Sequence, residues 1–115
     1  MYNIQSYIVS IDGILEDAIK CIELNHSRCA IIVDKKMKVY GVISDGDILR
    51  SILNGKNIYS PIKNNININF KFLKKKNKKE ALKIIKKFCI SLIPVVDEDL
   101  ILKDIITLEE ILTDF

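Results

Sequence analysis

Residues 41–50 of this chain read Gly-Val-Ile-Ser-Asp-Gly-Asp-Ile-Leu-Arg, and residues 104–112 read Asp-Ile-Ile-Thr-Leu-Glu-Glu-Ile-Leu. Each stretch passes from β-branched apolar residues into a helix-prone segment, and the change falls at a hydroxyl residue, Ser44 or Thr107. A carboxylate follows three positions later, at Asp47 or Glu110. The pattern predicts a strand that runs directly into a helix, and it occurs twice.

The two stretches belong to an internal repeat. Residue 107 lies 63 positions after residue 44, and the same offset places residues 79–85 over 16–22 and residues 93–97 over 30–34. No gap is needed between Ala18 and Leu49. Three matching blocks in one register indicate two homologous halves, which we place at residues 1–55 and 70–115 with a polar connector at 56–69.

Each half shows the same order of patterns. Apolar residues at helical spacing come first, then two β-rich runs around a polar turn, then a short helix. In the first half the expected elements are a helix over 14–24, strands over 29–34 and 39–43, and a helix over 45–53. In the second half they are a helix over 78–88, strands over 92–96 and 100–106, and a helix from 108 to the end. An extended segment, 66–73, ends the connector.

Composition restricts the class of protein. The 115 residues are 49% hydrophobic and 29% charged with a net charge of +3, which favours a small packed domain over disorder or a dedicated nucleic-acid binder. No apolar run is long enough for a membrane span, and no secretion signal begins the chain. Three cysteines without C-x-x-C spacing favour neither disulfides nor zinc, so we expect small core residues and a cytoplasmic protein. His26 has no evident catalytic partner, and no catalytic or metal site is predicted.

The hydroxyl–carboxylate pairs at the strand-to-helix junctions have two compatible interpretations. One is a capping box, in which Ser44 or Thr107 accepts from an amide of the first helical turn. The other is a ribose-phosphate site, because free amides at a helix start attract phosphate and a carboxylate one turn in can accept ribose hydroxyls.

These residues resemble the CBS-domain pair, or Bateman module. The resemblance is carried by Gly41-Val-Ile-Ser44-Asp-Gly-Asp47 and by Ile93-Pro94-Val-Val-Asp97, and it covers nearly the whole chain. It implies an α+β fold of tandem β-α-β-β-α repeats with pseudo-two-fold symmetry. The longer string through Arg50 is similar to pairs attached to sugar-nucleotidyltransferases and sugar-phosphate isomerases, although Ser44 and Ser51 depart from the Thr and Arg typical there.

The resemblance implies a regulatory module without chemistry of its own, which binds AMP, ADP, ATP or S-adenosylmethionine between its halves. In the first site, Asp47 would take the ribose hydroxyls and Ser44 the phosphate. Backbone and apolar side chains around Ile43, Ala30 and Ile31 would hold the base, and Arg28 is a further candidate for phosphate contact. The resemblance also implies a homodimer. The chain is expected to be the N-terminal regulatory part of a sugar-nucleotidyltransferase.

The second half would supply a corresponding site. Thr107 and Glu110 would contact phosphate and ribose there, with Ile93 and Pro94 against the base. Asp104 stands where the first half has Gly41, and its charge is expected to repel phosphate. We therefore expect the first site to be the better nucleotide site.

The segment 71–87 carries nine lysines and one glutamate. Its apolar residues recur at helical spacing, which favours a solvated lysine face over a nucleic-acid surface, and one or two lysines could draw an anionic nucleotide toward the cleft. Two alternatives to a nucleotide sensor stay open. One is an oligomerisation module without a ligand, and the less favoured one is nucleic-acid binding through the lysine-rich helix.

Overall fold

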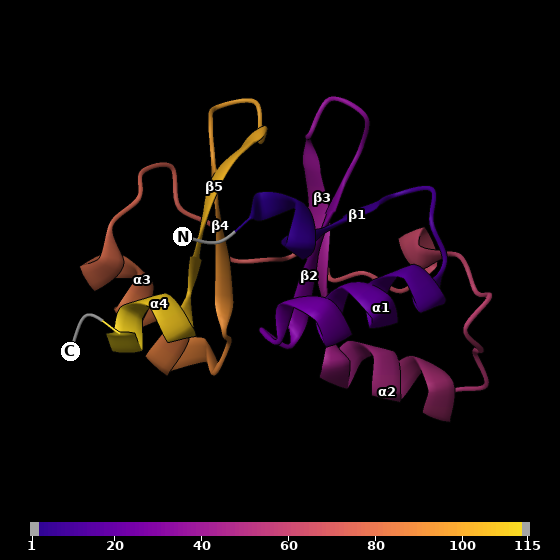
Figure 1. The fold of residues 1–115 in the computed structure, drawn as a ribbon. Coiled ribbons are helices and arrows are strands. Elements are labelled where there is room, and N and C mark those ends of the chain that lie inside the picture. The colour runs from indigo at the N-terminus through magenta and orange to yellow at the C-terminus, as the bar shows by residue number, and fades with distance from the viewer. Residues whose placement is uncertain (1–2, 114–115) are drawn as a thin grey trace.

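In the computed structural model, which describes residues 3–113, the chain forms two sheets with helices beside each (Figure 1). The first sheet has the order β1-β2-β3, in which β1 is parallel to β2 and β2 is antiparallel to β3. The elements of this first half are η1 (Ile4–Tyr7), β1 (Ile8–Ser10), α1 (Leu15–Asn25), β2 (Cys29–Val33), β3 (Val39–Ser44) and α2 (Asp45–Leu53).

The second half repeats this order around a two-stranded sheet. Its elements are α3 (Lys78–Phe88), β4 (Leu92–Val96), β5 (Leu102–Thr107) and α4 (Leu108–Thr113). Where the first half has β1, the second has a single bridge between Leu73 and Val95. The predicted α+β fold of two β-α-β-β-α repeats is confirmed, with the opening strand of the second repeat reduced to that bridge.

The repeat is also visible in the backbone. Positive φ angles occur at His26 (57°) and Cys89 (54°), and again at Met37 (68°) and Leu100 (63°), and each pair is 63 residues apart. In the hairpin turns, the amide of Val39 donates to Leu100 and the amide of Leu102 donates to Met37, both at 2.9 Å. Equivalent turns therefore pair with each other, which places a pseudo-two-fold axis between them.

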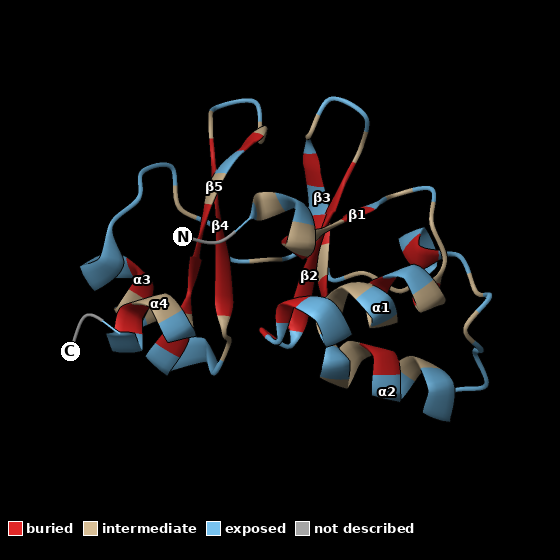
Figure 2. Ribbon diagram, viewed as in Figure 1, coloured by how far each residue is buried: buried red, intermediate tan, exposed pale blue. Residues whose placement is uncertain are grey.

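Burial is concentrated in the strands (Figure 2). All five residues of β2 and all five of β4 are buried, because each strand has a packed layer on both faces. One core cluster joins the two sheets and includes Ile31, Val33, Leu92 and Ile105. Two further clusters lie under α1 and α2 and under α3 and α4. The halves therefore share a core.

The connector is anchored to the first half. Its short 3-10 helix, η2 (Ile62–Asn64), buries Ile62 completely. Amides in the first turn of α1 donate to connector carbonyls, Leu15 to Ser60 at 3.0 Å and Glu16 to Ile58 at 2.9 Å. These bonds satisfy donors that a helix start leaves without intrahelical partners.

The expectation that the cysteines are core residues fails for one of the three. Cys29 is buried and Cys21 is partly buried, but Cys89 is exposed. Cys89 follows the last turn of α3 in the left-handed conformation, so the apolar periodicity of the helix no longer describes its position. Among the described residues, no helix has the length and apolar character needed to cross a membrane.

Candidate functional site

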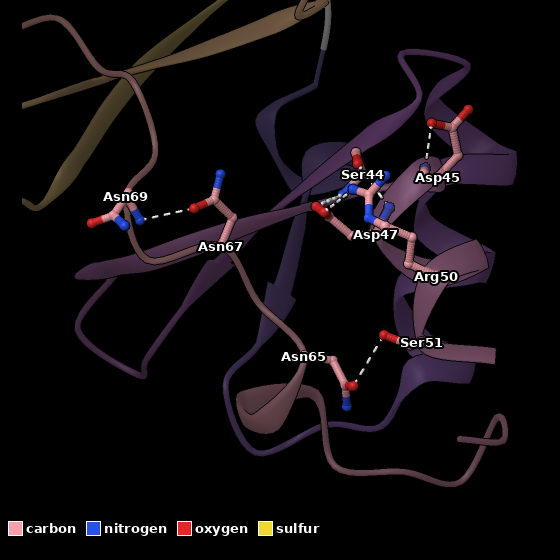
Figure 3. Close-up of polar contacts among 9 residues, drawn as sticks. Ser44, Asp45, Asp47, Arg50, Ser51, Asn65, Asn67 and Asn69 are labelled. Atoms are coloured by element: carbon pink, nitrogen blue, oxygen red, sulfur yellow. Dashed lines mark hydrogen bonds and ion pairs between the residues drawn. The ribbon is translucent and has the colours of Figure 1, made fainter. Parts of the chain in front are cut away.

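A cleft of about 700 Å³ lies between the two halves, within the size range of small-molecule sites. Three segments form its walls. The first is the junction of β3 and α2 with Arg28 and Cys29 beside it. The second lies within residues 67–71, where the connector ends, and the third is the end of α3 with the start of β4 and with Leu108 at the start of α4. Figure 3 shows residues of the first two walls, with Ser44 and Asp47 at the start of α2 and with Asn67 and Asn69 on the neighbouring extended segment.

Ser44 and Asp47 lie at this cleft and form the predicted capping box. The Ser44 hydroxyl accepts from the Asp47 amide at 3.1 Å, and Oδ2 of Asp47 accepts from the Ser44 amide at 2.9 Å. Oδ1 of Asp47 accepts from Arg50 Nη2 at 2.6 Å (Figure 3). Because a carboxylate oxygen has two lone pairs, Oδ1 can accept from a further donor, such as a ribose hydroxyl.

The first amides of α2 are not free, contrary to the assumption behind the sequence-based phosphate site. The Asp45 amide donates to the Arg28 carbonyl at 3.0 Å, and the Gly46 amide donates to Oδ1 of Asp45 at 2.8 Å. The Asp47 amide is the one already held by Ser44. A phosphate in this cleft would therefore depend on cationic side chains rather than on helix amides.

Arg28 lies on the cleft wall, where the sequence analysis expected a candidate phosphate contact. Its Nε lies 2.8 Å from Oδ2 of Asp45, and both side chains are well exposed. The hydrogen bond from Arg28 lowers the pKa of Asp45. The pair uses one of the five guanidinium N–H donors of Arg28.

Four cations and two carboxylates line the cleft, which gives it a net positive charge. The cations are Arg28, Arg50, Lys71 and Lys86, and the carboxylates are Asp45 and Asp47. Lys71 and Lys86 belong to the lysine-rich segment, one or two of whose lysines were expected to attract a nucleotide. The sequence analysis missed Arg50 as a site residue, although an arginine three positions after an acid on a helix signals such a pair.

The three residues expected to hold the base do not line the cleft. Ala30, Ile31 and Ile43 are each 0% exposed in the core. Side chains alternate along a strand, so Cys29 and Val42 line the cleft in place of Ala30 and Ile43. Ile31 is on the same face of β2 as Cys29, but it packs inside the core cluster between the two sheets. In this structure an apolar surface for a base comes from Val42, Phe70 and Ile90.

Gly41 allows the connector to form its wall. Asn67 pairs with Val42 through two backbone hydrogen bonds, of 2.8 and 3.1 Å. A Cβ at position 41 would lie 2.6 Å from the carbonyl oxygen of Asn67. The close approach of the connector to β3 therefore requires glycine at this position.

The second predicted site is occupied by the chain's own side chains. Thr107 is 3% exposed and accepts from the Glu110 amide at 3.0 Å, as in the first half. The Glu110 carboxylate, however, pairs with Lys76 at 3.1 Å and Lys78 at 3.5 Å, and Lys76 also pairs with Asp104 at 3.4 Å. Ile93 is fully buried.

Pro94 is also fully buried, so neither residue expected against the second base reaches solvent. A smaller pocket of about 400 Å³ lies beside α4, lined among others by Ser27, Ser91 and Leu112. Neither Thr107 nor Glu110 lines this pocket. The structure thus brings the second motif together, and lysines hold its carboxylate, which lines neither this pocket nor the cleft between the halves.

Comparison with known proteins gives a family-level match and several structural likenesses. The family model for the CBS domain matches residues 4–54 and 77–115. No curated protein sequence matches the chain. The AcuB protein from Vibrio cholerae is 24% identical, with a TM-score of 0.82 over 94% of this chain and 81% of that one.

Two similar structures were solved with nucleotides. A CBS domain protein from Pyrobaculum aerophilum, complexed with AMP, is 16% identical with a TM-score of 0.76, covering 94% of this chain and 88% of that one. The cytosolic domain of the Mg²⁺ channel MgtE, in complex with ATP, is 18% identical with a TM-score of 0.74. That match covers 96% of this chain and 45% of that one. At these identities the likeness concerns the fold.

Proposed function

Because the chain belongs to the CBS-domain family and carries two such domains in tandem, we propose that it is a regulatory module that binds an adenosine nucleotide. The ligand lies in the cleft between the halves, with Asp47 on the ribose hydroxyls and Ser44 near the phosphate. The observation that carries this proposal is the cleft itself. It combines an accepting carboxylate, four cations and an apolar wall in one cavity.

Charge favours a phosphate-bearing nucleotide over S-adenosylmethionine. The cleft carries four cationic and two acidic side chains, and Lys86 comes from the second half whereas Arg28 and Arg50 come from the first. A nucleotide phosphate is attracted by this field, while the permanent sulfonium cation of S-adenosylmethionine is repelled. The nucleotides AMP, ADP and ATP are the proposed ligands, and affinity should rise with the number of phosphates.

One nucleotide per chain is the proposed stoichiometry. The first motif faces a cleft, whereas Glu110 of the second is held by Lys76 and Lys78. A ligand in the second site would have to displace both lysines and would meet Asp104, so binding there pays for two broken ion pairs.

The regulatory signal is a change in the relative packing of the halves. A phosphate held by Lys86 on one side and Arg28 or Arg50 on the other favours the arrangement in which these cations are closest. Ligand binding therefore stabilises one packing of the two sheets over others, and an attached or associated protein can respond to that shift.

The experiment is calorimetric titration with AMP, ADP, ATP and S-adenosylmethionine. Wild type should bind the nucleotides with Kd below about 1 mM and with one site per chain. Asp47→Ala should weaken binding about 10- to 100-fold, because a hydrogen bond to a charged group contributes about 1.5–3 kcal/mol.

Glu110→Ala is the matched control, since it removes the equivalent carboxylate from the equivalent helix outside the cleft. It should bind nucleotide as wild type does. A second pair consists of Lys86→Ala, which removes a cleft cation, and Lys83→Ala, which removes an exposed lysine one turn earlier on α3. No binding of any nucleotide below about 1 mM would refute the sensor function.

In that event the second candidate is an oligomerisation module without a ligand. The Arg50–Asp47 pair favours it, because this arginine takes one of the acceptor positions of the carboxylate that a ribose would use. The lysine-rich helix gives less support to nucleic-acid binding, since Lys76 and Lys78 are paired with carboxylates of the second half.

We also propose that the regulated partner is a sugar-nucleotide enzyme and that the module acts as a homodimer in the cytoplasm. The string from Gly41 to Arg50, similar to pairs attached to sugar-nucleotidyltransferases, supports the first point. Sequencing the coding region beyond Phe115 tests it: a nucleotidyltransferase signature in the same reading frame is expected, and an immediate stop codon refutes the covalent link.

A further inference from the structure

A contact between Lys71 and Phe88 joins two walls of the cleft. Nζ of Lys71 lies over the Phe88 ring, 4.3 Å from its centroid, and both residues line the cavity. Lys71 comes from the wall within residues 67–71, whereas Phe88 is the last residue of α3. The contact is therefore a cation–π interaction between the end of the connector and a helix of the second half.

The backbone on both sides of Lys71 is held in place. Phe70 packs against the core cluster that joins the two sheets. The amide of Leu73 donates to the carbonyl of Pro94 at 3.0 Å, and the amide of Val96 donates to the carbonyl of Leu73 at 2.9 Å. Lys71 itself is exposed, and its ammonium group stands on a flexible four-carbon stem. Its side chain can therefore change partners while the backbone stays where it is.

The Phe88 ring is a weak partner for an ammonium group. Within residues 3–113, Lys71 forms no ion pair, and this ring is the partner that the structure gives it. A ring attracts a cation through its quadrupole alone, whereas a phosphate group carries full negative charge. A phosphate that enters the cleft is therefore the stronger partner for Lys71.

We propose that Lys71 exchanges the Phe88 ring for a phosphate group when a nucleotide enters the cleft, so that the ring competes with the ligand for this lysine. The inference rests on the proposed function and names the contact through which a phosphate acts on the second half, because the exchange uncovers a ring at the end of α3. Lys87, whose Nζ lies 5.4 Å from the same centroid, does not line the cleft and stays with the ring.

Inorganic tripolyphosphate tests the exchange without a nucleoside. In the free chain, the ring current of Phe88 should shift the ε-methylene protons of Lys71 upfield in an NMR spectrum, and Lys71→Met identifies their signal by removing it. Tripolyphosphate and ATP should each return this signal to the position of an exposed lysine. Adenosine, which has no phosphate, should leave it shifted.

The same spectra separate this proposal from the nucleotide-sensor function. If tripolyphosphate moves the Lys71 signal but no adenosine nucleotide binds, the exchange stands and the sensor function is refuted. If ATP binds and the signal keeps its upfield shift, the sensor function stands and the exchange is overturned. A signal that neither tripolyphosphate nor ATP moves overturns the exchange in every case.

Calorimetric titration with ATP gives an independent measure. Phe88 is 42% exposed, so Phe88→Leu leaves the core intact. This variant should bind ATP with a Kd about two- to fivefold lower than wild type, because an exposed cation–π contact contributes about 0.5–1 kcal/mol and no longer has to be broken. In the Lys71→Met background, the same Phe88→Leu change should leave Kd unchanged, because no ammonium group remains to be released.

The opposite sign would assign the ring a different role. If Phe88 were a stacking surface for the base, Phe88→Leu would raise Kd in both backgrounds, and that result would overturn the proposal. Two controls lie outside the cleft: Lys87→Ala removes the other lysine on the ring, and Phe72→Leu changes a phenylalanine that is 38% exposed. Both should bind ATP as wild type does. A loss of affinity in Lys87→Ala as large as that in Lys71→Met would indicate a general effect of charge and would also overturn the proposal.

Discussion

Replacing Gly41 with alanine tests whether the connector must lie directly against β3. The added Cβ would be 2.6 Å from the carbonyl oxygen of Asn67 and 3.2 Å from its carbonyl carbon. Ordinary non-bonded contacts are about 3.5–4.0 Å, so the connector would have to move by about 1 Å. The two backbone hydrogen bonds between Asn67 and Val42, of 2.8 and 3.1 Å, are the contacts that this movement would break.

The expected loss in the free energy of unfolding follows from these two hydrogen bonds. Each backbone hydrogen bond contributes about 1 kcal/mol, and alanine returns about 0.5 kcal/mol by restricting the unfolded chain. The free energy of unfolding should therefore fall by about 1.5 kcal/mol, and any remaining steric strain adds to the loss. Urea unfolding followed by circular dichroism measures this as a lower midpoint with an unchanged slope.

Gly46→Ala is the matched control. Gly46 lies in the first turn of α2, and its added Cβ would come no closer than 3.4 Å to the flexible end of Arg50. Alanine is a better helix former than glycine by about 1 kcal/mol, so this variant should be more stable than wild type. The reasoning is refuted if Gly41→Ala unfolds within about 0.5 kcal/mol of wild type, or if the two variants shift stability in the same direction.

Three further predictions concern single side chains. Burial raises the pKa of the Cys29 thiol to about 12. Iodoacetamide at pH 8 should therefore modify exposed Cys89 first and Cys29 only on unfolding, which mass spectrometry can show. Bound nucleotide should slow the labelling of Cys89, because this residue lines the cleft. The amide of Ile101 donates to Asp97 and lowers the pKa of this carboxyl. The hydrogen bond to ionised Asp97 stabilises the fold fully above the pKa of the unfolded chain, about 3.9, and this stabilisation is lost as pH falls through the lower pKa of the folded chain. The difference in unfolding free energy between wild type and Asp97→Asn should therefore close below about pH 4 in acid denaturation. Asn25→Ala should lower the unfolding free energy by about 2–4 kcal/mol in urea titrations, because the buried side-chain amide of Asn25 makes hydrogen bonds with the backbone of Ser6, Ser27 and Cys29. A loss below about 1 kcal/mol would contradict this.

The helices, strands and helix caps could be predicted because their sequence signals come from residues close together along the chain. The repeat register of 63 residues was evident from the sequence and reappears in the backbone, where Met37 and Leu100 share positive φ angles. The Ser44–Asp47 pair was also readable, since a capping box needs two side chains three residues apart on one chain segment. Helical and strand periodicity located the four helices of the two halves and the hairpin strands because burial of one face repeats at a fixed spacing.

Which residues line the cleft depends on contacts between segments that are distant in the sequence. Alternation along β2 and β3 shows that neighbouring residues face opposite sides, but only the packing of the sheets decides that Val42 faces the cleft while Ile43 lies in the core. Arg28 and Asp45 likewise lie 17 positions apart, and they are joined by a side-chain ion pair and by the backbone hydrogen bond from the Asp45 amide to the Arg28 carbonyl. No local pattern encodes such a contact.

The same distinction separates the two motifs. By sequence alone, Thr107 and Glu110 match Ser44 and Asp47 in type and spacing, and they form the same helix start. Tertiary structure then pairs Glu110 with Lys76, just before α3, and with Lys78, its first residue, while Asp47 lines a cavity between the two halves. Sequence therefore determined the repeated fold and its helix caps, whereas the three-dimensional packing of charges decided which carboxylate is held by lysines and which faces the cleft. The reason is that electrostatic pairing depends on distance in space and not on separation along the chain.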